Sequence, residues 1–166
     1  MAKMMHIEES QVIDAQSEAL NAVLRDYQVG HPAILPKPYF SALTVEKGGE
    51  GEGTVLRGSV TAFGTVRAFH QQVTEPKPGR VLVETDVETG QYTTFTFEPL
   101  NGGSQTLVTI ASDFPVTPGF IGFVEKLTTP AFIHRLYRQE LKNLAEYVRS
   151  LKSAQRFSYE EKEVYV

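Results

Sequence analysis

The sequence predicts a single α+β domain in which an antiparallel sheet packs against a long C-terminal helix. Between Tyr39 and Asp113 the chain forms a series of short strand-like segments with glycine and proline turns between them, and no segment there has helix length. Such short connections favour antiparallel neighbours, because parallel strands need long crossovers. After Pro130, apolar residues recur at helical spacing as far as Leu151. The length of 166 residues fits one domain.

The first part of the chain predicts one strand and one helix. Apolar residues on one phase indicate a strand over Met4–Ile13. Asp14 or Ser17 can cap the helix that follows, and Gly30 is expected to end it. Three prolines within His31–Pro38 remove backbone donors and fix φ, so we expect a loop or a broken helical turn there.

Six further strands are predicted, each bounded by turn residues. The glycine run over 48–53 lacks the Lys-Ser/Thr ending of a phosphate loop, so we interpret it as a hairpin turn. The expected strands are Tyr39–Glu46, Thr54–Ala62, Thr65–Glu75, Arg80–Asp86, Gln91–Glu98 and Ser104–Asp113.

The C-terminal third is predicted to be helical. Thr117-Pro118 and Thr129-Pro130 each have the pattern of an N-cap followed by proline at the first helical position. They start a short and a long helix, or they belong to one kinked helix. Residues 1–152 form the predicted domain, and residues 153–166 form a polar tail that frays or pairs on a sheet edge through Val164–Val166.

Composition excludes several classes of function. The net charge is −4, with 20 acidic against 16 basic residues and no block of Lys or Arg, so neither nucleic acid nor an anionic membrane surface is an expected partner. The absence of cysteine excludes disulfides and thiol catalysis. Without an apolar run behind the first residues, or any of membrane-spanning length, we expect a cytoplasmic protein with no membrane insertion. The oligomeric state stays open.

Metal, cofactor and hydrolase motifs are missing from the sequence. No two of the four histidines, His6, His31, His70 and His134, stand at metal-ligand spacing. No Gly-x-Ser-x-Gly segment occurs either. We therefore expect no metal site and no cofactor.

Four segments, in this order of elements, resemble a known superfamily. They are Val12-Ile13-Asp14-Ala15 after the first strand, Gly51-Glu52-Gly53-Thr54, Gly102-Gly103-Ser104-Gln105-Thr106 and Asn143-Leu144 in the terminal helix. The chain resembles the START/Bet v 1-like (SRPBCC) superfamily, also called the polyketide cyclase/dehydrase and lipid-transport family, over roughly Met4–Leu151. It departs from many members in having no tryptophan and a proline-rich segment after the first helix. The resemblance implies a helix-grip fold, with a curved sheet of about seven strands wrapped around the long helix and a hollow that binds ligands.

The predicted site is an apolar cavity between the sheet and the long helix. His134 shares the inward stripe of that helix, although it also fits a surface or core histidine. Polar residues on the middle strands, including His70, face either solvent or the interior, and an inward one would anchor a ligand or act as an acid or base. Phe114, Phe120 and Phe123 are assigned to core or lining. The predicted ligand-binding residues are His134, Tyr137, Leu141, Phe95, Phe97, Arg67, Glu84 and Tyr92.

Three functions remain open on the sequence alone. The first is binding of an apolar or aromatic small molecule, lipid-like or polyketide-like, in the internal cavity. The second is a polyketide cyclase or aromatase that uses polar groups in the same cavity, so whether the protein is an enzyme is left undecided. The third is a protein-interaction module. Two or more ionisable groups that converge inside would favour the enzyme.

Overall fold

The computed structural model describes residues 4–115 and 119–163, with side chains for residues 4–115 and 128–156. The predicted helix start at Thr117-Pro118, the edge pairing through Val164–Val166, and the side chains of Phe120 and Phe123 lie outside the described residues.

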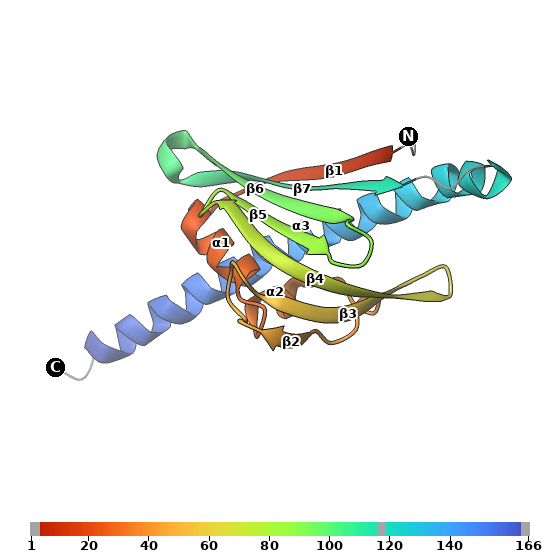
Figure 1. Ribbon diagram of the computed structural model, residues 1–166. Helices are drawn as coiled ribbons and strands as arrows, with labels where there is room; N and C mark the ends of the chain where they lie inside the picture. Colours follow the sequence, from red (N-terminus) through yellow and green to blue (C-terminus); the bar gives the residue numbers. More distant parts are fainter. Residues whose placement is uncertain (1–3, 116–118, 164–166) are drawn as a thin grey trace.

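Seven strands, three α-helices and one 3-10 turn make up the described chain (Figure 1). In chain order they are β1 (Met4–Ile13), α1 (Ser17–Arg25), α2 (Gly30–Ile34), β2 (Thr44–Lys47), β3 (Val55–Ala62), β4 (Thr65–Lys77), β5 (Val81–Asp86), β6 (Tyr92–Leu100), the 3-10 turn η1 (Asn101–Gly103), β7 (Gln105–Pro115) and α3 (Gly119–Glu163).

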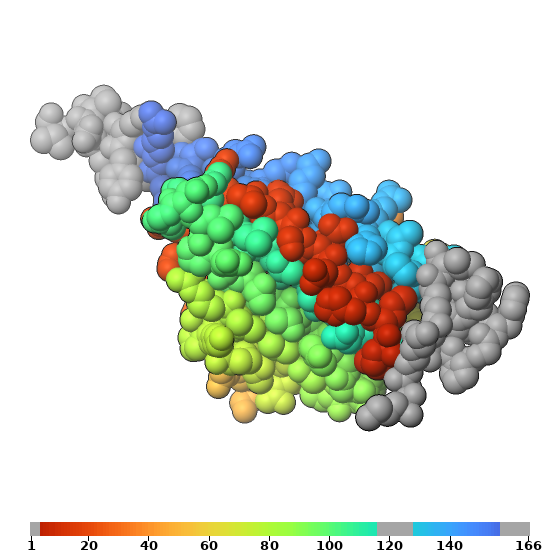
Figure 2. All heavy atoms as spheres, turned by 90° about the horizontal axis from the view of Figure 1, so that it is seen from above, coloured from red at the N-terminus to blue at the C-terminus, as the bar shows by residue number. Residues whose placement is uncertain are grey.

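The strands form one sheet in the order β1-β7-β6-β5-β4-β3-β2. Every neighbouring pair is antiparallel, which confirms the predicted meander. The first strand pairs with the last, so β1 lies between β7 and α3, as the red strand in Figure 2 shows. The sheet curves around α3, and α1 and α2 cover its other end (Figure 1). This is the helix-grip arrangement that the resemblance implied.

The segment between β1 and β3 differs most from prediction. Gly30 begins α2 rather than ending α1, because the Asp26 carboxylate accepts hydrogen bonds from the backbone N–H groups of residues 28–30 and reverses the chain. Neither predicted residue caps α1, since Gln16 occupies that position and Ser17 Oγ instead accepts a hydrogen bond from Arg80 Nη1 at 3.1 Å.

Strand boundaries also shift at one short strand and at one proline. The predicted strand over Tyr39–Glu46 shrinks to β2, and Phe40 makes only an isolated bridge with Val60. Pro76 was expected in a turn but lies within β4, where the register to β5 shifts between Thr74 and Lys77. That irregularity accommodates a residue without a backbone donor.

The C-terminal helix is one continuous element. Pro130 lies inside α3, so Thr129-Pro130 does not start a helix and the one-helix alternative is the correct one. Residues 153–163 extend the same helix instead of forming a frayed tail. All of residues 151–156 are exposed, so this part of α3 projects past the sheet (Figure 1).

The hydrophobic core fills the space between the concave face of the sheet and the three helices. Leu20 and Leu24 of α1, Ile34 of α2 and Leu144 of α3 are each no more than 1% exposed. Core residues of the sheet and of α3 include Leu56, Val73, Leu82, Phe95, Phe97, Val108, Ile110, Leu136 and Leu141. In the described part of the chain, no helix combines the length and the apolar character needed to cross a bilayer.

Candidate functional site

A row of polar side chains crosses the concave face of the sheet. The strand register places Glu84 of β5 opposite Thr93 of β6, and Thr93 opposite Ser112 of β7. Each lies two residues along its strand from a core residue, so it points to the same side as the core. We call Glu84, Thr93 and Ser112 the polar belt. It places hydrogen-bonding groups inside an otherwise apolar interior.

One end of the belt forms a chain of hydroxyl groups with α3. The Thr93 and Ser112 hydroxyl oxygens are 2.7 Å apart, and Ser112 Oγ lies 2.5 Å from the hydroxyl oxygen of Tyr137. Burial raises the pKa of Tyr137 to about 12. Its phenol therefore stays protonated at neutral pH and can donate a hydrogen bond.

The other end of the belt belongs to a buried group of ionisable side chains. Tyr27 donates a hydrogen bond from its hydroxyl to Glu84 Oε1 at 2.8 Å. His31 Nδ1 donates to the Leu24 carbonyl at 2.7 Å, while Glu84 Oε1 lies 3.6 Å from Nδ1 and Glu140 Oε1 lies 3.6 Å from Nε2. Tyr27, His31, Glu84 and Glu140 are at most 7% exposed, and we call them the ionisable cluster.

Opposite charges set the protonation of this cluster. Burial lowers the pKa of His31, but the negative charges of Glu84 and Glu140 outweigh burial and raise it to about 9. Burial raises the pKa of Glu84 despite the opposing charge of His31. Glu140 Oε1 is buried without a hydrogen bond, so the imidazolium of His31 is the charge that compensates it. At neutral pH the cluster therefore holds a protonated histidine between two carboxyl groups.

Aromatic contacts hold the imidazole in place. Tyr27 stacks on His31 with ring centroids 4.9 Å apart, and Phe95 meets the same imidazole edge-on at 5.6 Å. Tyr27 on one ring face, Phe95 beside the ring and the Leu24 carbonyl at Nδ1 together fix the orientation of the imidazole between the two carboxyl groups.

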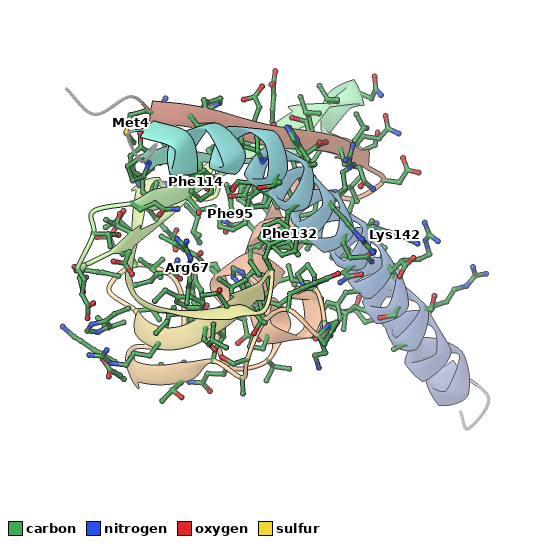
Figure 3. All side chains as sticks on the ribbon, turned by 90° about the vertical axis from the view of Figure 1, so that its right-hand side faces the viewer. Met4, Arg67, Phe95, Phe114, Phe132 and Lys142 are labelled. Carbon is green, nitrogen blue, oxygen red and sulfur yellow. The ribbon has the colours of Figure 1, made fainter. Side chains whose placement is uncertain are left out.

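Beyond the polar belt, the concave face becomes less buried on four strands. The next concave positions toward the start of α3 are half-buried on β1, β3, β4 and β7, where the neighbouring inward residues are fully buried. The half-buried apolar residues at this end, which we call the open end, are Met5, Val60, Phe69, Phe114, Phe132 and Ile133. Figure 3 views the molecule from this end and labels Phe114 and Phe132.

Arg67 lies on the concave face at the open end. It pairs in register with Val60 and is an even number of residues from buried Val73, so it shares their face of the sheet. Arg67 is exposed, and it makes no ion pair with any residue that the structure describes.

The other predicted site residues divide into three groups. Glu84 and Tyr137 belong to the polar groups just described. Phe95, Phe97 and Leu141 are at most 2% exposed and belong to the packed core.

His134 and Tyr92 form the third group, which belongs neither to the polar groups of the interior nor to the packed core. His134 Nδ1 lies 2.7 Å from Glu9 Oε1 at the β1 edge. Tyr92 is on the convex face, since it neighbours concave Thr93, and its hydroxyl donates to Asp113 Oδ2 at 3.2 Å. Tyr92 therefore cannot line the interior.

Sequence reasoning missed His31 and Glu140. Glu140 carries a usable signal, because it lies three residues after Tyr137 and four before Leu144 on the apolar stripe of α3, where a carboxylate is out of place. His31 carries none, because its segment was interpreted as a loop. No group of three or more His, Cys, Asp or Glu side chains in the described chain is arranged to hold a metal ion.

Comparisons with known proteins agree with this architecture. A family model described as polyketide cyclase / dehydrase and lipid transport matches residues 4–149. A search of curated proteins gives no match.

Solved structures show the same fold. The KanY protein is 26% identical, with a TM-score of 0.76, and the match covers 89% of this chain and 99% of that one. The Zhui aromatase/cyclase from a Streptomyces species has a TM-score of 0.71 at 18% identity, covering 89% and 94%. A norcoclaurine synthase from a Thalictrum species, in complex with a transition-state analogue, has a TM-score of 0.69 at 15% identity, covering 92% and 98%.

Proposed function

Since this chain belongs to the polyketide cyclase/dehydrase and lipid-transport family, we propose that it binds a small apolar or aromatic molecule against the concave face of its sheet. The proposed place is the open end, between β3, β4, β7 and α3, with the polar belt as its inner boundary.

The gradient of burial along the concave face carries this proposal. Fully buried core residues give way, past the polar belt, to apolar side chains that remain half-exposed while facing α3. Phe63, at the tip of the β3–β4 hairpin, is 67% exposed and contacts the ring of Phe132 with centroids 5.2 Å apart. Apolar surface left open on an inward face gains free energy when a ligand covers it, at about 25 cal/mol per Å².

Polar groups on both sides of this surface define the chemistry of the ligand. Arg67 lies at the outer side and favours a carboxylate or a polarised carbonyl. The hydroxyl chain that ends at Tyr137 lies at the inner side and favours a hydrogen-bond acceptor. The proposed ligand therefore has an apolar body with oxygen atoms at its ends.

A charge placed at the open end tests where the ligand binds. Val60 is half-buried on the concave face of β3, and Thr61 is exposed on the convex face of the same strand. Val60→Arg should weaken binding of the neutral fluorescent probe N-phenyl-1-naphthylamine by about tenfold or more, since the apolar contact is lost. Thr61→Arg is the matched control and should bind like the parent. Circular dichroism confirms that both variants fold.

The result that contradicts the proposal is equal binding by Val60→Arg and Thr61→Arg. Binding of this neutral probe should also change little with salt, because no ionic contact drives it.

Arg67 is tested with a charged ligand. Arg67→Gln should weaken binding of 2-naphthoate by about tenfold and leave binding of N-phenyl-1-naphthylamine unchanged, because only the carboxylate contacts the guanidinium. Arg57→Gln removes a cation from the convex face of β3, where Arg57 pairs with Glu46, and should change neither ligand. Equal losses in the two variants would show that net charge, rather than Arg67, attracts the naphthoate.

Catalysis of the cyclase type is the second candidate, and the ionisable cluster favours it. Two carboxyl groups, an imidazole and two phenols converge at the belt, and such groups move protons in reactions next to a carbonyl. The phenol of Tyr137 can donate to a carbonyl oxygen on which negative charge develops.

Deuterium exchange separates an enzyme from a carrier. Acetophenone is incubated with the protein in deuterated water, and NMR measures deuterium incorporation into its methyl group. An enzyme should accelerate exchange, and Tyr137→Phe should reduce that acceleration, whereas Tyr147→Phe should not. A rate equal to that in buffer alone, together with probe binding, would identify the protein as a carrier.

A further inference from the structure

A hollow lies outside the grip, between α3 and the proline-rich segment after α2. It has a volume of about 730 Å³, which is within the usual range for small-molecule sites. Its lining comes from five residues within the range 33–39 on one side and from seven residues within the range 135–150 of α3 on the other, and Arg149 is not among them. Its lining includes no residue of the polar belt or of the ionisable cluster, and it does not include Arg67. We call this hollow the outer groove.

The floor of the outer groove is apolar and its rim is polar. Leu35 and Leu136, both buried, form the floor, while Tyr39 and Tyr147 are half-buried. The exposed rim carries Lys37, Arg135, Gln139, Glu146 and Ser150, together with Ala33 and Pro38. An apolar floor under a charged rim suits an amphiphilic ligand.

Positive and negative side chains are distributed unequally along the groove. Arg135 lies near the end where Tyr39 contacts the ring of Phe132, with centroids 5.4 Å apart. Glu146 follows Arg135 by about 16 Å along α3, at about 1.5 Å per residue, and its carboxylate lies 3.9 Å from Lys142. Arg135 and Lys37 form no ion pair with the described residues, so the groove has unneutralised cations and a neutralised carboxylate.

The walls are held in place before any ligand arrives. Pro36 and Pro38 flank Lys37 and restrict its backbone. Asn143 donates a hydrogen bond from Nδ2 to the Ile34 carbonyl at 2.8 Å, which ties the proline-rich segment to α3. Preformed walls lower the entropy cost of binding, and they give this proline-rich segment a role that the interior site does not supply.

We propose that the outer groove is a second binding site for an amphiphilic organic anion. Its carboxylate, sulfonate or phosphate contacts Lys37 and Arg135, and its flat or aliphatic body covers Leu35 and Leu136 between the two tyrosines.

The test maps two fluorescent probes by NMR on the full-length, 15N-labelled protein. The anion 1-anilinonaphthalene-8-sulfonate should shift the amide signals of residues 33–39 and 135–150. N-phenyl-1-naphthylamine has the same rings without the sulfonate and should leave those signals in place. Added salt should weaken binding of the anion at the groove, because the contacts are ionic and solvent-exposed.

Two double variants separate a built site from general charge attraction. Lys37→Ala with Arg135→Ala should weaken the sulfonate at the groove by about tenfold or more. Lys47→Ala with Arg149→Ala removes two exposed cations outside the groove and should leave its binding unchanged. Shifts confined to the concave face, or equal weakening in both double variants, would overturn the proposal. Neither outcome depends on whether the open end binds a ligand.

Discussion

The buried histidine predicts how the stability of the protein depends on pH. The pKa of His31 is about 9 in the folded protein and 6.5 as a free side chain. Below pH 6.5 the imidazole is protonated in both states, and its contribution to folding is complete. Between the two values only the folded state keeps the proton, so the free energy of unfolding falls as pH rises. The difference, at about 1.4 kcal/mol per pH unit, amounts to about 3 kcal/mol.

His31→Gln isolates this contribution. The variant loses the imidazolium between Glu84 and Glu140, and we expect it to be less stable than the parent by about 3 kcal/mol near neutral pH. The gap between parent and variant should narrow as the pH rises through about 9, because the parent then loses its charge too. Urea unfolding followed by circular dichroism measures both chains from about pH 6 to about pH 10, since the chain has no tryptophan to report by fluorescence.

Two outcomes would refute this reasoning. A stability gap that stays constant across the range would mean that folding leaves the pKa of His31 unchanged. A gap that widens with pH would mean that burial, rather than the carboxyl groups, controls its pKa. If His31→Gln does not fold, His31→Gln combined with Glu84→Gln removes one buried carboxylate as well and should restore folding with a flat pH profile.

Two further predictions concern stability. Tyr137→Phe should cost about 1 kcal/mol, because the Ser112 hydroxyl keeps Thr93 as a partner, whereas Tyr147→Phe should stay within about 0.5 kcal/mol in urea unfolding. Gly51→Ala should cost about 2 to 4 kcal/mol, because φ is +59° and the added Cβ would collide with the ion pair between half-buried Arg25 and buried Glu75. Gly79→Ala, with φ of +74° and no atom within 4 Å, should cost only about 1 kcal/mol in the same measurement, and equal losses would exclude the collision.

Elements with regular periodicity could be predicted from the sequence. The bounds of β1 were predicted correctly, because Met5, Ile7 and Ile13 share one phase of the strand and lie on its less exposed face. The segment from Gly30 to Lys47 could not be predicted, because its path depends on the Asp26 carboxylate and on contacts with β3 and α3 rather than on local propensity. For a related reason the sequence left open whether Pro130 starts a helix or lies inside one, because helix propensity alone disfavours an internal proline.

Site residues could be predicted where alternation along a strand decides which face of the sheet they occupy. They could not be predicted where distant segments of the chain meet. Glu84 faces inward because it is two residues from Leu82, and the same parity places Tyr92 outside. Parity alone could have excluded Tyr92 beforehand, because Phe95 and Phe97 were expected to face inward and Tyr92 lies an odd number of residues from both. The cluster around His31 joins three elements that are remote in the chain, and no local pattern predicts that convergence.

The pairing of β1 with β7 has a consequence for synthesis on the ribosome. Ser10 bonds to Thr109, 99 residues further along the chain. At about 5–20 residues per second, the first strand waits about 5 to 20 s before β7, its neighbour among the described strands, has been translated. During that time β1 has no ladder to join, and α3, which covers its inner face, is made later still. In a nascent chain of this topology, β1 is the first strand that chaperones can bind, and its pairing completes the sheet last.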